Sequence, residues 1–344
     1  MGFSTATAKK VQSSLGFYPS YFGDANGMGG GLTKLLKRWR SNYYLSAFLA
    51  FAARPFYVAF SRTARSIEQR VQKNGVTIRL PNGRTMSIER DSGINMASLL
   101  FWHGLDGYEP ETSRTLRFFF ERAATFLDVG ANCGLYSVLG AQWNANLQVT
   151  AFEPVPRIFS SLKRNILSNG LESRVRCENV ALSSKSGTAT FFLPQSEGPD
   201  SETTGTLASE SWQRRKGSPV LEVKTVRFDE FEAASPMHVD LIKIDVEDFE
   251  ADVLEGMQQV ITRDRPFIIC EVLPRTHRNE RTCRIVEALK YQIYWITPHS
   301  YIKVPQFDFN RGSFTDFLLS PVSTPDVVLD DLNVLWDLRK NWTR

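Results

Sequence analysis

Two carboxylates placed two residues apart, Asp245 and Glu247, are the side chains of this sequence best suited to acid–base chemistry. They follow an apolar run that predicts a strand, and side chains two apart on a strand point the same way. Repulsion between two such carboxylates raises the pKa of one of them toward a range useful for a general base. We take Asp245 as the candidate base and Glu247 as its partner. The alternative is a structural ion network in which Lys243 or a nearby arginine neutralises the pair.

Three further polar residues are candidates for contacts with the molecule that this base would deprotonate. Glu271 ends a later predicted strand and would bind hydroxyl groups, although a surface or packing role fits it equally well. His103 and Glu109 lie ahead of the sheet in a helix and a turn that would close over the site. For His103, a partly buried, hydrogen-bonded histidine is the stronger alternative. A divalent metal needs several oxygen ligands, and no other residue is spaced to complete a set with Asp245 and Glu247, so no metal is expected.

A glycine-rich turn between a strand and a helix predicts a second site, for a ligand that approaches the backbone closely. The turn reads Asp128-Val-Gly130-Ala-Asn132-Cys-Gly134, and its glycines leave room for such an approach. The alternative is a turn where a strand and a helix merely pack.

An acidic residue at the tip of the next strand narrows the choice of ligand. Glu153, followed by Pro154, is suited to gripping ribose hydroxyls. The turn lacks the Gly-x-Gly-x-x-Gly/Ala spacing of a nicotinamide dinucleotide site, so no pyrophosphate cradle is evident. The carboxylate of Asp128 would repel a pyrophosphate but tolerate a cationic, phosphate-free ligand such as S-adenosylmethionine.

The elements that must position these residues alternate from Ala124 onward between short apolar strands and longer amphipathic segments. This alternation predicts an α/β fold with a mostly parallel sheet and helices on both faces, whose ligands bind at the carboxyl ends of the strands. Helices are expected from Leu135 and over Arg157–Ser168. Strands are expected at Thr125–Val129, Gln148–Phe152, Val175–Asn179, Val239–Ile244, Pro266–Val272, Tyr291–Thr297 and Phe314–Leu319.

The segments around this core suggest the domain organisation. We expect a flexible arm over residues 1–31, N-terminal helices and a β-hairpin as a cap over 32–123, a core domain over 124–325 and a tail with a short helix over 326–344. The hairpin has an Asn82-Gly83 turn. The polar stretch 194–219 is expected to be an exposed loop beside the site, with the Arg214–Lys216 triplet either solvated or facing an anionic acceptor.

The apolar-aromatic segment within residues 32–60 raises the question of a membrane. Arg54 and Pro55 interrupt it, and a spanning helix needs about 20 predominantly apolar residues. We expect a helix packed on the protein or a partner, with peripheral membrane contact as the alternative.

Composition excludes several classes of protein. A net charge of +4 over 344 residues gives no basic field for nucleic acid, and 42% hydrophobic residues exclude intrinsic disorder. The four cysteines have neither zinc-site nor disulfide spacing. A cytoplasmic protein is expected, with association with a membrane as the alternative.

Taken together, three segments resemble successive signatures of the FkbM-type methyltransferases. They are Asp128–Ser137, Phe152-Glu153-Pro154 and Asp240–Glu250. The likeness extends from about Gly104 to about Glu271, which is about half of the chain, in the family's order. One departure is Asp248, where the family usually has glycine. If that glycine serves a left-handed backbone, Asp is among the better tolerated replacements.

The resemblance implies a class I methyltransferase fold, with a Rossmann-like seven-stranded sheet and S-adenosylmethionine as the methyl donor. It also implies methyl transfer to a hydroxyl oxygen of a glycan or a small hydroxylated metabolite. On the same ground, Asn179 and Ala181, which follow the third strand, would meet the adenine. A non-catalytic S-adenosylmethionine-binding or membrane-surface protein with this fold is the alternative, but the acceptor-side carboxylates favour an enzyme. The acceptor and the oligomeric state are left open.

Overall fold

The computed structural model describes residues 75–89, 96–193, 207, 220–273, 276–298, 300–307 and 315–324. The expected N-terminal arm, the helix within 32–60 with its membrane contact, the C-terminal tail and nearly all of the 194–219 loop lie outside these residues. Within them, no helix is both long and apolar enough to cross a bilayer.

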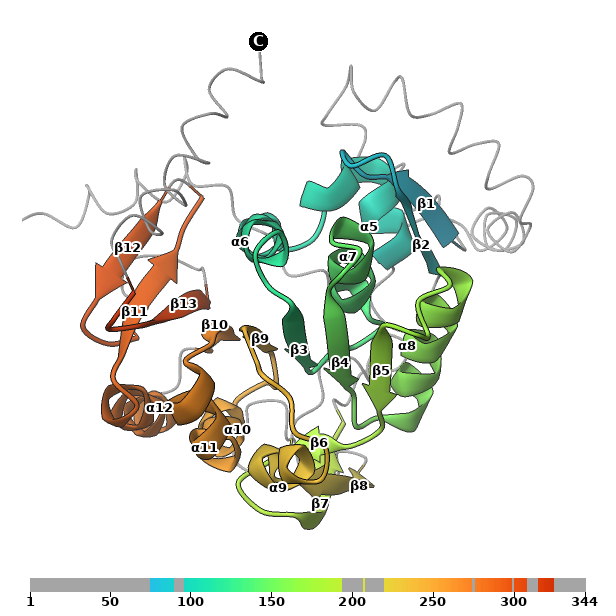
Figure 1. Ribbon diagram of the computed structural model, residues 1–344. Coiled ribbons are helices and arrows are strands. Elements are labelled where there is room, and N and C mark those ends of the chain that lie inside the picture. The colour runs from blue at the N-terminus through green and yellow to red at the C-terminus, as the bar shows by residue number, and fades with distance from the viewer. Residues whose placement is uncertain are drawn as a thin grey trace, which may run out of the picture.

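An eight-stranded sheet forms the centre of the molecule (Figure 1). Its order is β12-β11-β13-β10-β9-β3-β4-β5, and the run from β10 to β5 is parallel, whereas β13 is antiparallel to both β10 and β11. The strands are β3 (Thr125–Val129), β4 (Gln148–Phe152), β5 (Val175–Glu178), β9 (Leu241–Ile244), β10 (Phe267–Glu271), β11 (Tyr291–Ile296), β12 (Tyr301–Val304) and β13 (Asp316–Pro321). The predicted parallel core is confirmed.

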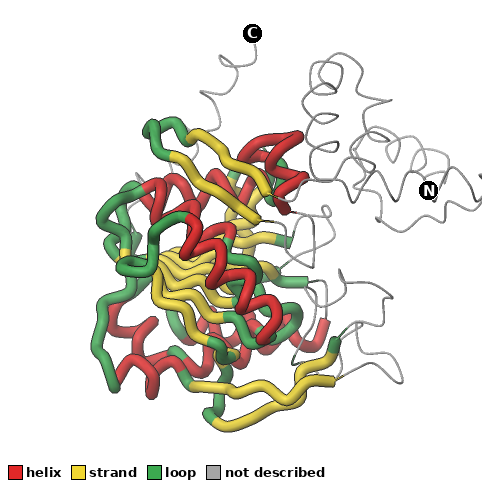
Figure 2. The backbone as a smooth tube through the Cα atoms, turned by 90° about the vertical axis from the view of Figure 1, so that its right-hand side faces the viewer, coloured by secondary structure: helices red, strands yellow, loops and turns green. Residues whose placement is uncertain are grey.

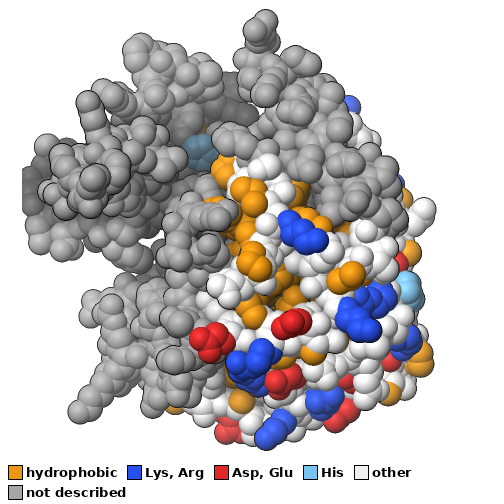
Figure 3. All heavy atoms as spheres, turned by 90° about the vertical axis from the view of Figure 1, so that its left-hand side faces the viewer, with side chains coloured by type: hydrophobic (Ala, Val, Ile, Leu, Met, Phe, Trp, Pro, Cys, Tyr) orange, Lys and Arg blue, Asp and Glu red, His pale blue; other side chains and the backbone are white. Residues whose placement is uncertain are grey.

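The sheet has one strand more than the seven expected. β12 pairs antiparallel with β11 after a tight turn in which Thr297 and Ser300 bond each other's backbone. Its middle residues, Ile302 and Lys303, are exposed, so the segment lacks the buried apolar run that identified the other strands. The face of the molecule at this end of the sheet carries hydrophobic side chains next to a region rich in charged ones (Figure 3).

Side-chain alternation along the strands divides the core between the two faces of the sheet. On β3, Phe126 belongs to one hydrophobic cluster and Leu127 to the other. The Phe126 face is covered by α5 (Met96–His103), α6 (Pro110–Phe120), α7 (Leu135–Trp143) and α8 (Pro156–Ser168). The Leu127 face is covered by α9 (Phe228–Ala233), α10 (Glu250–Gly256), α11 (Gln258–Asp264) and α12 (Thr276–Ala288).

Two small sheets flank this sandwich (Figure 2). The predicted hairpin is present as β1 (Gly75–Arg79) and β2 (Thr85–Glu89). The Asn169 and Asn165 side chains of the α8 region accept the backbone N–H groups of Ser87 and Glu89 at 2.8 and 2.9 Å. At the other end, β6 (Ala181–Leu182), β7 (Gly187–Phe192) and β8 (Val220–Val226) form a three-stranded sheet in the order β6-β8-β7.

Candidate active site

Most of the residues singled out in the sequence line a single cavity at the carboxyl ends of the parallel strands. Four do not: Asp128, Gly134, Asn179 and His103. Those that do are Glu109, Gly130, Asn132, Glu153, Pro154, Ala181, Asp245, Glu247 and Glu271. Most of the candidate residues named from the sequence therefore lie together in one cavity, although four of them lie outside its lining.

The glycine turn after β3 satisfies its own backbone donors. The N–H groups of Gly130 and Ala131 both donate to the carbonyl oxygen of Phe152, at 3.0 and 2.9 Å. The N–H of Asn132 donates to Oε2 of Glu153 at 3.0 Å. A phosphate-binding loop needs such amides free to point at its ligand. Because these amides are committed to β4, the turn is unsuited to a pyrophosphate, which supports the exclusion made from the glycine spacing.

Gly130 lets the turn after β3 approach the backbone at Asp245 closely. Its φ is +80°, and a Cβ there would lie 1.8 Å from the carbonyl oxygen of Asp245. At Gly134, where φ is +85°, a Cβ would lie 2.5 Å from Cδ1 of Leu162 of α8, so a side chain there would have to displace Leu162. The first glycine therefore lets two loops touch, and the second lets a helix pack against the turn.

Glu153 ends β4 with its carboxylate buried in the cavity wall. Oε1 accepts the N–H of Val155 at 2.9 Å and Oε2 that of Asn132, which leaves each oxygen a lone pair for a ligand hydroxyl. Burial nevertheless dominates and raises the pKa of Glu153 to about 7. Asn179 supports this turn from behind by donating to the carbonyls of Glu153 and Pro154 at 2.8 and 3.0 Å.

Asp128 lies beneath the turn and not in the cavity. It is 1% exposed and accepts the hydroxyl of Ser137 at 2.6 Å. Burial raises the pKa of this carboxyl, and the charge of Lys243 opposes the rise. Asp128 is thus placed to hold the start of α7 against β3.

The candidate base, Asp245, follows β9 and is paired with a buried lysine. Lys243 is 3% exposed, and its Nζ donates to Oδ2 of Asp245 at 2.7 Å. Burial by itself would raise the pKa of Asp245, but the charge of Lys243 and hydrogen bonds from Glu271 and Lys243 outweigh it and hold the pKa below its usual range. The ion network that we kept as an alternative is therefore present at this residue.

The expected pairing of Asp245 with Glu247 is wrong. β9 ends at Ile244, and the backbone turns left-handed at Glu247 (φ +53°) and at Asp248 (φ +77°), so the alternation of a strand does not reach these residues. The carboxyl with the strongly raised pKa is instead Glu271, through burial and the charges of Asp245 and Asp316. A hydrogen bond between Glu271 and Asp245 contributes to this rise and lowers the pKa of Asp245. The left-handed φ of Asp248 agrees with the reason suggested for the family's glycine.

Residues from distant parts of the chain surround Asp245 and Glu271. Glu109 precedes α6 and accepts the hydroxyl of Tyr136 at 2.9 Å, with Nζ of Lys243 at 4.0 Å. Asp316 on β13 lies directly opposite Glu271 of β10, and burial raises the pKa of Asp316 to about 7. The sequence did not reveal Tyr108, Tyr136 or Asp316. An acidic residue opening a strand was the only available signal for Asp316.

Another part of the cavity lining is apolar and includes residues of β6 and β7 and Leu207. Ala181 lines it together with Val180, Leu182 and Phe191. His103, by contrast, lies exposed at the end of α5 and away from the cavity. Across the described part of the chain, no group of three or more His, Cys, Asp or Glu side chains is arranged to hold a metal.

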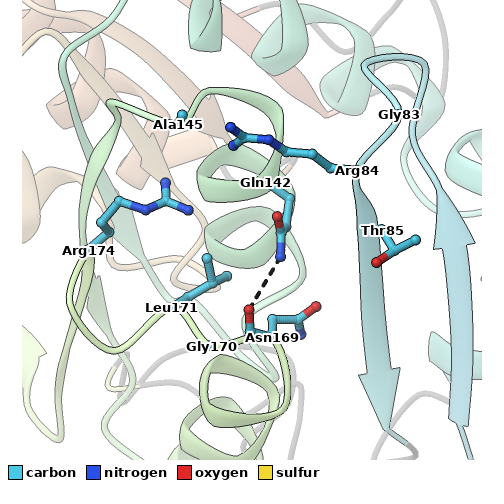
Figure 4. A pocket seen from close by; sticks show the side chains of 9 residues that line it. All are labelled: Gly83, Arg84, Thr85, Gln142, Ala145, Asn169, Gly170, Leu171 and Arg174. Carbon is cyan, nitrogen blue, oxygen red and sulfur yellow. Dashed lines mark hydrogen bonds between the residues drawn. The ribbon is translucent and has the colours of Figure 1, made fainter.

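A larger and more open hollow, of about 510 Å³, lies near the amino end of β5 (Figure 4). Arg84 and Arg174 border it, and Gln142 donates to the carbonyl of Asn169 at 3.4 Å. One guanidinium nitrogen of Arg174 bonds the carbonyls of Ala141 and Asn144, at the end of α7, where a cation is favourable. This hollow contains none of the candidate catalytic carboxylates, and the contacts of Arg174 fit a structural role.

Comparison with known proteins finds similarity to methyltransferases. Residues 128–294 match the methyltransferase FkbM domain. Methyltransferase sdnD of Sordaria araneosa is 29% identical over 155 residues, which cover 39% of this chain and 60% of that protein. The 2-O-methyltransferase NoeI of Sinorhizobium fredii is 30% identical over 155 residues, which cover 42% of this chain and 61% of that protein. The chain thus spans about three fifths of the length of these relatives.

Among solved structures, methyltransferase FkbM from Methylobacillus flagellatus KT is similar over 78% of this chain and 60% of that one, at 12% identity and a TM-score of 0.38. The described sheet, parallel from β5 to β10 with β13 antiparallel, is the expected class I methyltransferase architecture. Residues 128–294 of this chain are therefore similar to the methyltransferase FkbM domain.

Proposed function

We propose that this protein transfers the methyl group of S-adenosylmethionine to a hydroxyl oxygen of a glycan or small hydroxylated metabolite, with Asp245 as the general base. The single observation that carries the proposal is that an ionised carboxylate, Asp245, lines the same cavity as Glu153 and the Gly130 turn. A ligand held by the turn and Glu153 would therefore lie beside a group able to accept a proton.

The residues around the turn fit an adenosyl donor. Glu153 has lone pairs for the ribose hydroxyls, and the apolar wall around Ala181 and Phe191 suits the adenine. The turn amides are committed to β4, which suits a donor without phosphate. When bound, S-adenosylmethionine supplies a methyl group on a sulfonium, whose charge disappears on transfer.

Asp245 would take the proton that the acceptor must lose. As the acceptor oxygen bonds to the methyl carbon, the carbon–sulfur bond breaks with its electron pair passing to sulfur, and the hydroxyl proton passes to Asp245. The hydroxyl becomes strongly acidic as its oxygen acquires the methyl group, so a carboxylate of low pKa suffices as base. Positioning of acceptor and donor supplies much of the remaining acceleration.

The acceptor side of the cavity favours an acceptor without negative charge. Glu109, Asp245, Glu247 and Glu271 line it, and the described lining residues include no lysine, arginine or histidine. Carboxylates accept hydrogen bonds from the hydroxyl groups of a polyol and repel a phosphate or a carboxylate. The name of the relative NoeI, a 2-O-methyltransferase, agrees with transfer to oxygen.

Titration calorimetry of the whole chain tests the donor before the acceptor is known. We expect S-adenosylmethionine and S-adenosylhomocysteine to bind and NAD not to bind. The donor-loaded protein is then screened with neutral, amino-bearing and anionic glycans and metabolites by transfer of labelled methyl. Absence of binding by both adenosyl ligands would remove the proposed donor. Donor binding without transfer to any hydroxyl would favour a non-catalytic binding protein.

A further inference from the structure

A buried cation, Lys243, lies next to the carboxylates of the candidate site. It is on β9, where its Cα is in register with Asp128 of β3 and Ile269 of β10. Nζ lies 2.7 Å from Oδ2 of Asp245 and 5.0 Å from the centre of the Tyr136 ring. The ammonium is 4.0 Å from Oε2 of Glu109. One side chain from the middle of the sheet therefore contacts groups supplied by β9, α7 and the start of α6.

The groups that face this ammonium are predominantly acidic. Besides Asp245, the ammonium interacts electrostatically with Asp128, which lies beneath the turn after β3, and with Glu109 and Asp316. Burial by itself would lower the pKa of Lys243, but the charges of Asp245, Glu109 and Asp128 raise it, so the ammonium stays charged. Glu271, whose pKa is raised by burial and by the charge of Asp245, is hydrogen-bonded to Asp245.

We propose that Lys243 is a positioning residue of the active site, whose ammonium keeps the Asp245 carboxylate ionised and fixes its orientation toward the acceptor. This rests on the proposed function, in which Asp245 is the base. Lys243 does not line the cavity, so it acts through Asp245 and not on the substrate directly. Without the charge of Lys243, burial would raise the pKa of Asp245 against the remaining hydrogen bond from Glu271, and Asp245 would take up a proton.

Substitution by methionine separates the charge of Lys243 from its packing. Methionine has a similar length and an apolar, flexible side chain, so it fills the strand position without an ammonium. Lys243→Arg keeps the charge with a different geometry. Lys224→Met is the matched control, since Lys224 is an exposed residue of β8. The double variant Lys243→Met/Asp245→Asn removes both charges and avoids leaving a buried carboxylate alone.

The direct test is an NMR titration of isotope-labelled aspartate carboxyls in the whole chain, with the Asp245 signal identified by its loss in Asp245→Asn. We expect Asp245 to titrate below the usual aspartate range in the natural protein and in Lys224→Met. It should titrate well above that range in Lys243→Met and return toward the natural value in Lys243→Arg. An unchanged Asp245 titration in folded Lys243→Met would overturn the proposal. If Lys243→Met does not fold, Lys243→Arg and the double variant decide the question. A natural Asp245 titration in Lys243→Arg together with a folded double variant supports the proposal. A double variant that also fails to fold assigns Lys243 to packing and overturns the proposal.

A second readout distinguishes this proposal from the proposed function. In Lys243→Met, S-adenosylmethionine should bind within a few-fold of the natural affinity. Once an acceptor is known, kcat should fall by about 10² or more, with its acid limb displaced to higher pH. Failure of the natural protein to bind any adenosyl ligand would remove the proposed function and leave the aspartate titration as an independent result. An unchanged pH profile of kcat in Lys243→Met, in a protein that retains methyl transfer, would exclude a positioning role for Lys243.

Discussion

The two sides of the cavity are built in different ways. After the roles proposed for them, we call the turn after β3 with Glu153 the donor side, and Asp245 with Glu109 and Glu271 the acceptor side. On the donor side, the turn after β3 and the end of β4 are locked by main-chain hydrogen bonds, and Glu153 is held by two backbone amides. On the acceptor side, Asp245 is held by side chains, those of Lys243 and Glu271. Backbone bonds do not titrate, whereas the contacts of Asp245 depend on where its neighbours keep their protons. Changes of charge on the acceptor side should therefore disable that side and leave the main-chain bonds of the donor turn intact.

The largest effect is expected where the two sides touch. Gly130→Ala places a Cβ against the Asp245 carbonyl and forces a side chain to φ +80°. Together, strain and displacement should lower the free energy of unfolding by about 3 kcal/mol or more and impair both donor binding and turnover. Thermal and chemical unfolding measure it. Gly170→Ala is the control, because Gly170 also has positive φ (+64°) but has nothing within 4 Å. Equal effects of the two substitutions would show that the contact with Asp245 is unimportant.

A change confined to the acceptor side should separate turnover from binding. Asp245→Asn removes the base but keeps its size, so kcat should fall by about 10² to 10⁴. The affinity for S-adenosylmethionine, measured by calorimetry, should change little. Natural turnover in this variant would exclude Asp245 as the base, and a large loss of donor affinity would mean that the two sides are not separable.

A change confined to the donor side should do the opposite. Glu153→Ala removes a charge-assisted bond to the ribose, worth about 1.5 to 3 kcal/mol, so donor affinity should fall by roughly 10-fold to 150-fold. Because the pKa of Glu153 is about 7 and only the ionised form accepts through both oxygens, affinity should also weaken as the pH falls below about 7. Calorimetry across pH measures both. Glu178→Ala, at the end of the neighbouring β5, should leave affinity unchanged.

The smallest expected effect concerns a carboxyl outside the cavity lining. Burial raises the pKa of Glu250, at the start of α10, to about 8. The folded state therefore binds this proton more tightly than the unfolded state, and ionisation should destabilise the fold as pH rises from about 5 to about 8. Glu250→Gln should flatten that decline, measured by chemical unfolding at several pH values. An unchanged pH dependence would show that Glu250 is ionised in the folded protein.

The sequence predicted the donor side better than the acceptor side because of how far apart their residues are in the chain. The donor turn is one continuous strand–turn–helix segment, so spacing alone identified Gly130, and an acid at the next strand end identified Glu153. The acceptor side joins residues from 108 to 316, and the position of Asp316 depends on the register of β13 against β10. No local pattern carries that register.

Individual errors have equally physical causes. Asp245 and Glu247 were paired on the assumption that β9 continues, but the strand ends at Ile244 and the chain turns left-handed. Asp128 ends β3 as predicted, yet its side chain points beneath the turn to Ser137. Strand ends are the least regular part of a sheet, and the direction of a side chain there is decided by tertiary contacts.

The contact at Gly130 limits how enzymes of this architecture can diversify. Because the backbone of the donor turn touches the backbone at Asp245, neither loop can be lengthened or shifted without moving the other. New acceptors are therefore more accessible through exchange of side chains that line the cavity, such as those of Glu109 and Glu247, than through insertions next to the base. In a directed-evolution library, these side chains are the positions to randomise, and Gly130 is the position to keep.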